Sequence, residues 1–225
     1  MSYEARITTA IIGLILFIIF FLIEVFFGFI EDETKRKRFK IIPLLIASIT
    51  IIIIAPNYPL IYMGAIFGLI GDALLIKEEK KIFFLLGTLS FFLGHICYLI
   101  AIILETNFNF VWWYIFIIIG SCFFVDLGLF PLLRKFSDKT TCICGGIYIF
   151  TLLMNLVTGI TFSVLYSPFY ILFSLGYALF MISDSMVMTK NFIKQFKRDD
   201  FYIMITYLLA QILLISGLLC PILIK

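Results

Sequence analysis

The chain has 225 residues, of which 63% are hydrophobic and 14% are charged, and its mean hydropathy is +1.16. Soluble domains carry about 45–50% apolar and about 25% charged residues, so a water-soluble fold is excluded and lipid must be the solvent. The formal net charge of +3 is small and scattered, and we expect no nucleic-acid partner. The length predicts a single transmembrane domain over residues 1–225.

The hydrophobic segments predict an all-α fold, a polytopic membrane bundle of about eight transmembrane helices. Each span needs about 20 apolar residues, because the hydrocarbon core is about 30 Å thick and a helical residue rises about 1.5 Å. Turn sequences at Asn57-Tyr58-Pro59 and Tyr166-Ser167-Pro168 separate neighbouring spans. In chain order, the expected helices are 7–30, 40–57, 58–77, 82–104, 111–133, 141–165, 168–189 and 201–224.

Basic residues occur only in alternate connections between these helices. All Lys and Arg except Arg6 and Lys225 lie in the connections 31–40, 77–81, 134–139 and 190–198. By the positive-inside rule these loops are cytoplasmic, and both termini face the lumen or the exterior. The expected location is the endoplasmic reticulum membrane for a eukaryotic source and the cytoplasmic membrane for a bacterial one.

Five ionisable residues lie within the expected spans, and each needs a reason to be there. They are Glu24, Asp72, His95, Asp126 and Asp184. A charged residue at a helix centre costs at least ~2.5–3.5 kcal/mol on insertion scales. Glu24 and Asp126 lie near cytoplasmic helix ends, where we expect them to snorkel to the interface. Asp72 and Asp184 are flanked by small residues, and both are expected at one depth, about 8 Å inside the cytoplasmic boundary.

The remaining polar positions have a pattern that repeats weakly four helices apart. Asp72 precedes a helix with His95 and Tyr98, and Asp184 precedes a helix with Tyr207 and Gln211. This pattern hints at a parallel 4+4 repeat around a common cavity. The polar groups at these positions, together with Tyr148 and Asn155, either join helices or hold a polar head group.

Small residues and the single histidine limit the chemistry further. Gly64, Gly68 and Gly71 form a bare stripe on which another backbone can approach closely. One histidine argues against a three-histidine zinc hydrolase, and a lone His95 is more often a core residue than a catalytic one. We expect the five cysteines to act as small buried hydrophobes, and we expect no metal or cofactor.

A series of short motifs in order along the chain carries a resemblance to a known family. They are Gly71-Asp72-x-x-Leu75, Gly94-His95-x-x-Tyr98, Tyr148 with Met154, Gly176-x-x-x-Phe180-x-x-Ser183-Asp184 with Phe192, and Tyr207-x-x-Ala210-Gln211 with Gly217. Over about residues 40 to 220 the chain resembles the YhhN family of integral membrane lysoplasmalogenases. The family usually opens its second helix with Lys-Pro, whereas two isoleucines separate Lys40 from Pro43 here, so the resemblance assigns no role to Lys40.

The resemblance implies hydrolysis of the vinyl-ether bond of lysoplasmalogens, giving a fatty aldehyde and glycerophosphoethanolamine or glycerophosphocholine. It implies a lysophospholipid substrate within membrane lipid, and Asp72 and Asp184 as catalytic residues. The expected substrate-binding residues are His95, Tyr98, Tyr148, Asn155, Ser183, Tyr207 and Gln211.

The residues suit this chemistry on independent grounds. A vinyl ether resists nucleophiles until its β-carbon is protonated, so the reaction needs a carboxylic acid and a nearby carboxylate. No Gly-x-Ser-x-Gly elbow is present, which disfavours ester hydrolysis. The main alternative is a transporter or channel, since intramembrane aspartates and repeats are typical of these proteins too. A receptor or a purely structural membrane protein is a further alternative.

Overall fold

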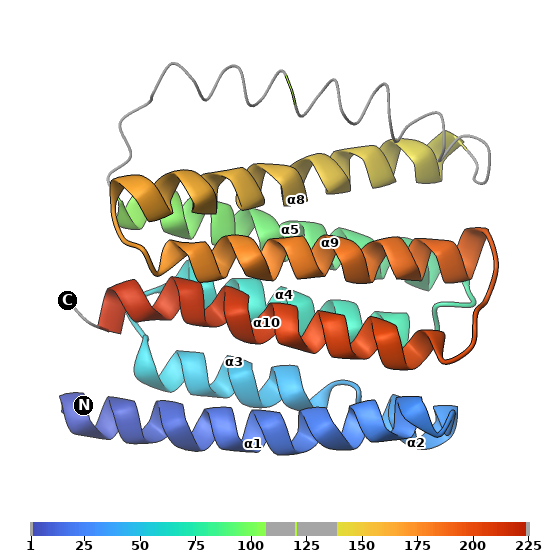
Figure 1. Ribbon diagram of the computed structural model, residues 1–225, viewed down its shortest axis with the longest axis horizontal. Helices are drawn as coiled ribbons and strands as arrows, with labels where there is room; N and C mark the ends of the chain where they lie inside the picture. The colour runs from blue at the N-terminus through green and yellow to red at the C-terminus, as the bar shows by residue number, and fades with distance from the viewer. Residues whose placement is uncertain (1, 107–119, 121–138, 224–225) are drawn as a thin grey trace. The chain divides into compact units, whose positions relative to one another are not determined.

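The computed structural model describes residues 2–106, 120 and 139–223 (Figure 1). Every regular element in these ranges is a helix, which confirms the predicted all-α fold. The predicted helix 111–133 lies outside the described residues, so the count of eight spans and the 4+4 repeat stay predictions. The helices are α1 (Tyr3–Phe29), α2 (Glu33–Phe39), α3 (Ile42–Ile54), α4 (Pro59–Leu75), α5 (Lys81–Glu105), α8 (Lys139–Leu165), α9 (Tyr170–Phe192) and α10 (Asp199–Leu223).

Five of the described helices, α1, α5, α8, α9 and α10, are long and apolar enough to cross a membrane. The described part of the chain therefore has the helices of a multi-pass integral membrane protein. Helices α3 and α4 are shorter, with 13 and 17 residues. At about 1.5 Å per residue, α3 rises only about 20 Å, which is less than the hydrocarbon thickness of about 30 Å.

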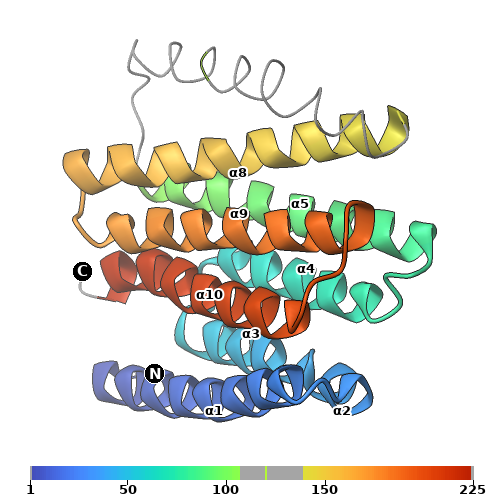
Figure 2. The ribbon, with the colours of Figure 1, turned by 45° about the vertical axis from the view of Figure 1, so that its right-hand side comes forward.

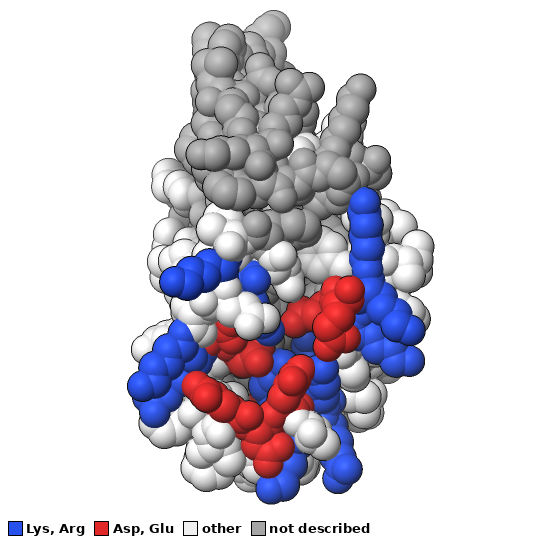
Figure 3. Space-filling view, turned by 90° about the vertical axis from the view of Figure 1, so that its right-hand side faces the viewer, with Lys and Arg blue, Asp and Glu red and all other residues white. Residues whose placement is uncertain are grey.

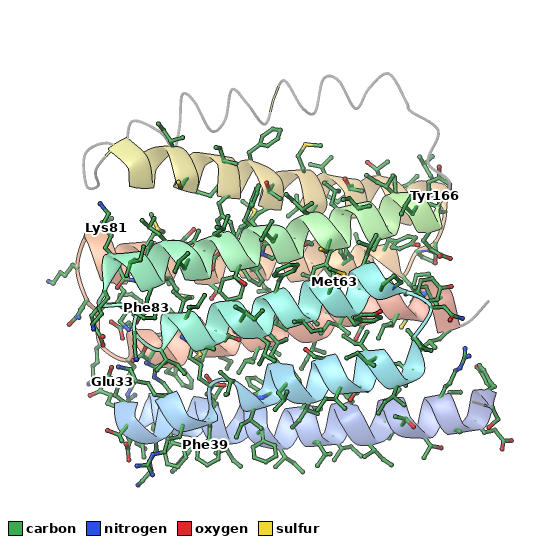
Figure 4. The ribbon with its side chains drawn as sticks, turned by 180° about the vertical axis from the view of Figure 1, so that it is seen from behind. Glu33, Phe39, Met63, Lys81, Phe83 and Tyr166 are labelled. Carbon is green, nitrogen blue, oxygen red and sulfur yellow. The ribbon has the colours of Figure 1, made fainter. Side chains whose placement is uncertain are left out.

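The chain divides into two compact units, Met1–Ala101 and Ile102–Lys225. In the first unit, α1 packs against α3 and α3 packs against α4. Figure 4 shows Glu33 and Lys81 at one end of this unit, while Met63 lies nearer the other end of α4. The two connections of this unit that are predicted to be cytoplasmic therefore lie at the same end. In the second unit, α9 packs against both α8 and α10 (Figure 2).

A short helix, α2, occupies the first basic connection, where no helix was predicted. The Asp32 carboxylate caps it by accepting a hydrogen bond from the Lys35 backbone N–H at 3.1 Å, and this bond holds the pKa of Asp32 below its usual value. Lys37 pairs with Glu33 at 2.6 Å and with Glu79, in the α4–α5 connection, at 3.0 Å. The Lys37–Glu79 pair joins two connections of the first unit. Figure 3 shows Lys, Arg, Asp and Glu side chains gathered on one face.

Glycines allow α4 and α5 to approach each other closely, which confirms the bare stripe. A Cβ added at Gly94 on α5 would lie 2.9 Å from the Gly64 carbonyl oxygen on α4. The Phe91 ring covers Gly71, and a Cβ added there would lie 2.8 Å from that ring. The Ser90 hydroxyl donates to the Phe67 carbonyl at 2.6 Å and adds a hydrogen bond across the same contact. These contacts fix the register of α4 against α5.

We predict that Gly94→Ala destabilises the protein, whereas Gly68→Ala has a much smaller effect. The new methyl group at position 94 meets backbone, and overpacking of this kind costs about 1–3 kcal/mol. At position 68 it meets only the Leu44 Cδ2 atom at 3.0 Å, and the better helix propensity of alanine, about 1 kcal/mol, offsets this contact. Unfolding titrations in mixed micelles measure both. Equal stability of the two variants would contradict the packing described.

Candidate functional site

In the first unit, three predicted site residues are buried on the facing helices α4 and α5. Asp72 lies near the C-terminal end of α4 and is 2% exposed, and His95 and Tyr98 on α5 are buried to a similar degree. Asp72 lies beside Gly71, which Phe91 covers. A carboxyl group in this place is shielded from water and lipid, as an intramembrane ionisable residue with a function would be.

The register of α4 against α5 orders these residues by depth. Gly94 packs between Gly64 and Gly68 of α4, so the neighbouring His95 lies about two turns, or ~10 Å, farther from the charged end than Asp72. The Tyr98 ring lies against Gly64, which places it about two turns, or ~12 Å, beyond Asp72. Asp72 therefore lies closest to the end of the first unit that carries α2.

Buried charges also occur where exposed or interfacial ones were expected. Glu24 on α1 is 1% exposed, so the prediction that it snorkels to the interface is wrong, because the helices of the first unit enclose it. Arg36 and Lys40, which the sequence placed in a basic loop, are buried as well. The sequence signal that could have revealed them is Asp32, which caps the N-terminus of α2 and so predicts a helix after it. On that helix Arg36 and Lys40 are four residues apart and share one face. Asp126 lies outside the described residues.

In the second unit, the central interaction joins Tyr148 on α8 to Asp184 on α9. The Tyr148 hydroxyl donates a hydrogen bond to the Asp184 Oδ2 atom at 2.6 Å. Tyr148 is buried and Asp184 is half-buried. The short distance is typical of a charge-assisted bond from a hydroxyl to a carboxylate. The bond fixes where the Asp184 carboxylate points.

Helix α10 supplies two more of the predicted residues. The Tyr207 ring packs edge-on against Phe180, with ring centroids 5.4 Å apart, and Gln211 is buried one turn farther along α10. Within the described residues, the Gln211 Oε1 atom is buried without a hydrogen-bond partner. Close packing of Gly176 against the Ala210 carbonyl oxygen, where an added Cβ would lie at 2.9 Å, positions this face of α10 against α9.

Ser183 and Asn155 make hydrogen bonds to backbone carbonyl groups. The Ser183 hydroxyl donates to Ile203 at 3.1 Å and so links α9 to α10. The Asn155 amide donates to Thr151 at 2.9 Å within α8. Both side chains therefore have a role in the packing of the second unit, and a role of either in substrate binding stays a prediction.

The structure groups the candidate residues by unit. Asp72, His95 and Tyr98 lie in the first unit, and Tyr148, Asn155, Ser183, Asp184, Tyr207 and Gln211 lie in the second. That Asp72 and Asp184 share one depth and face one cavity stays a prediction.

A comparison with models of protein families shows to which family the chain belongs. The model of the YhhN family matches residues 34–218. The chain belongs to the YhhN family. The match includes every candidate residue in both units, together with Arg36 and Lys40, and it excludes α1. No curated protein and no solved structure matches the chain.

We predict that Tyr148 and Asp184 stabilise each other measurably. A double-mutant cycle with Tyr148→Phe and Asp184→Ala should give a coupling energy of about 1.5–3 kcal/mol, the range for a hydrogen bond to a charged group. Unfolding titrations in mixed micelles provide the four stabilities. Tyr166→Phe removes a hydroxyl from an exposed tyrosine of the same helix region and serves as the control, with no coupling expected. Additive effects of Tyr148→Phe and Asp184→Ala would contradict the hydrogen bond.

Proposed function

We propose that the protein is a lysoplasmalogenase, which hydrolyses the vinyl-ether bond of lysoplasmalogens. The products are a fatty aldehyde and glycerophosphoethanolamine or glycerophosphocholine. Membership of the YhhN family, together with the activity that the sequence resemblance implies, supports this proposal. The observation that carries it is the environment of the two aspartates. Asp72 is buried on α4, and Asp184 accepts a hydrogen bond from the Tyr148 hydroxyl.

The reaction adds one water molecule across the vinyl ether. A carboxylic acid transfers its proton to the β-carbon, and the double bond becomes an oxocarbenium ion. A carboxylate stabilises this cation and takes a proton from the water that attacks it. The resulting hemiacetal breaks its bond to the glycerol oxygen, which leaves protonated, and the aldehyde is released. One acid and one carboxylate are therefore sufficient for the whole sequence.

The surroundings of the two aspartates favour different roles in this reaction. Asp72 is 2% exposed, so bulk water is kept away from its carboxyl group, which suits the proton donor. The hydrogen bond from Tyr148 holds the Asp184 carboxyl group in a fixed position, which suits the group that stabilises the cation. We therefore assign Asp72 as the general acid and Asp184 as its anionic partner.

Two buried polar atoms support a role of Tyr98 and Gln211 in substrate binding. Within the described residues, the Tyr98 hydroxyl and the Gln211 Oε1 atom have no hydrogen-bond partner. A buried polar group left unpaired costs about 1–3 kcal/mol, so such groups are expected where a ligand supplies the missing bond. Tyr207 belongs to the same face of α10 as Gln211, and its ring packs edge-on against Phe180.

We predict that Asp72→Asn and Asp184→Asn each lower turnover of lysoplasmalogen by at least ~10²-fold, the low end for general acid catalysis. Aldehyde release by purified protein in detergent measures the rate. Because the two carboxyl groups act as a unit, the double variant should be scarcely slower than either single one. Glu24→Gln, which neutralises another buried carboxyl group, is the control and should keep turnover. Near wild-type turnover by either folded single variant would disprove the paired mechanism, and a transporter would release no aldehyde.

We predict that His95→Gln keeps measurable turnover, because His95 lies about two turns deeper than Asp72 and is not the proton donor. The same aldehyde assay compares it with Asp72→Asn. A loss as complete as that of the aspartate variant would show that His95 takes part in the chemistry.

A further inference from the structure

Lys40 is a buried lysine for which the described part of the chain shows no partner. Its side chain lies at the C-terminal end of α2 and is 6% exposed. Within the described residues, no hydrogen bond or ion pair engages its ammonium group. Lysine is almost never fully buried unless it is paired. A cation held in this way lacks the anion that would offset the loss of its hydration.

The other lysines of α2 have a different environment. Lys35 pairs with Asp32 and Lys37 pairs with Glu33, and both lie at the surface of the first unit. Arg36 lies one turn before Lys40 and is buried like it. Positions 36 and 40 therefore form the buried face of α2, and two cationic side chains come from that face.

The packing of α3 on α4 places Lys40 near the level of Asp72. Leu44 on α3 contacts Gly68 on α4, where an added Cβ would lie 3.0 Å from the Leu44 Cδ2 atom. The two helices are consecutive and antiparallel (Figure 1). Lys40 precedes Leu44 by one turn through residues of right-handed helical conformation, and Asp72 follows Gly68 by one turn. Both side chains thus lie about one turn, or ~6 Å, from the Leu44–Gly68 contact, toward the charged end.

We propose that Lys40, with Arg36 beside it, binds the phosphate group of the lysophospholipid substrate. The inference rests on the proposed function and adds the residues that hold the head group. In the substrate, only the three glycerol carbons separate the phosphate oxygen from the vinyl-ether oxygen. A phosphate held at the level of Lys40 therefore keeps the vinyl ether within a short distance of Asp72. An ammonium group is a point charge that suits a phosphate in this role.

Binding of an ether lipid that cannot react tests this inference separately from hydrolysis. The probes are a 1-O-alkyl lysophosphocholine, whose saturated ether has no double bond to protonate, the matching 1-O-alkylglycerol without phosphate, and inorganic phosphate. Calorimetry in detergent compares the wild-type protein with Lys40→Met, with Lys40→Arg, which keeps the charge, and with Lys35→Met, which removes an exposed lysine of the same helix. We expect Lys40→Met to weaken binding of the lysophosphocholine about 10- to 100-fold and to leave binding of the alkylglycerol unchanged. Lys40→Arg and Lys35→Met should bind within a few-fold of wild type.

Each outcome separates the phosphate site from the hydrolase. Unchanged lysophosphocholine binding by Lys40→Met overturns the inference, and so does inorganic phosphate binding as tightly as the lipid, because the site would then belong to a free anion. Binding that depends on Lys40 in a protein that releases no aldehyde would keep the phosphate site and overturn the hydrolase. Lys40→Met should unfold no earlier than wild type, because no ion pair or hydrogen bond to Lys40 is lost within the described residues.

A measurement on the wild-type chain makes the test independent of whether the variant folds. Reductive methylation followed by mass spectrometry should show Lys40 protected by the lysophosphocholine and not by the alkylglycerol, with Lys35 modified equally in both. Equal modification of Lys40 with the two lipids overturns the inference.

Discussion

Lipid offers no hydrogen bonds, and this constraint limits where a charged group within a membrane helix can lie. A carboxylate or ammonium group within the hydrocarbon must be enclosed by protein and paired, or it must be kept for a ligand. Asp72 is buried on α4, and the Asp184 carboxylate accepts a hydrogen bond from the Tyr148 hydroxyl. Lys40 is enclosed and unpaired within the described residues. Charged groups that are buried in spite of the loss of hydration are therefore the candidates for a functional role.

Glycine contacts make this enclosure possible. Gly64, Gly71 and Gly94 bring α4 and α5 so close that added methyl groups would meet backbone or ring atoms, and Gly176 does the same for α9 and α10. Tight helix pairs leave few ways for a polar side chain to turn away, so the register of each pair sets the depth of its site residues. In the first unit this register places Asp72 nearer the charged end than His95. This order fits the proposal that Asp72 is the proton donor near the head group and that His95 lies nearer the aliphatic chain.

Much of the fold could be predicted from the sequence, because hydrophobic runs of about 20 residues have few interpretations other than membrane helices. The bounds of α5 and α8 differ from prediction by two residues or fewer. The short helix α2 was missed, since a run of charged residues carries no hydrophobic periodicity. Burial of Glu24, Arg36 and Lys40 depends on how α1, α2 and α3 pack, which a pattern along one chain does not encode. The Tyr148–Asp184 bond joins residues 36 positions apart, and only the second unit's packing reveals it.

The central claim is that a carboxylic acid within the membrane delivers a proton to the β-carbon of a vinyl ether. Hydrolysis of lysoplasmalogen by the purified protein in heavy water tests it most directly, because carboxyl protons exchange with the solvent before they are transferred. Mass spectrometry of the released aldehyde should find one deuterium on the carbon next to the carbonyl group, in step with the appearance of glycerophospho-ethanolamine or -choline. Absence of aldehyde, or aldehyde without that deuterium, would contradict the account.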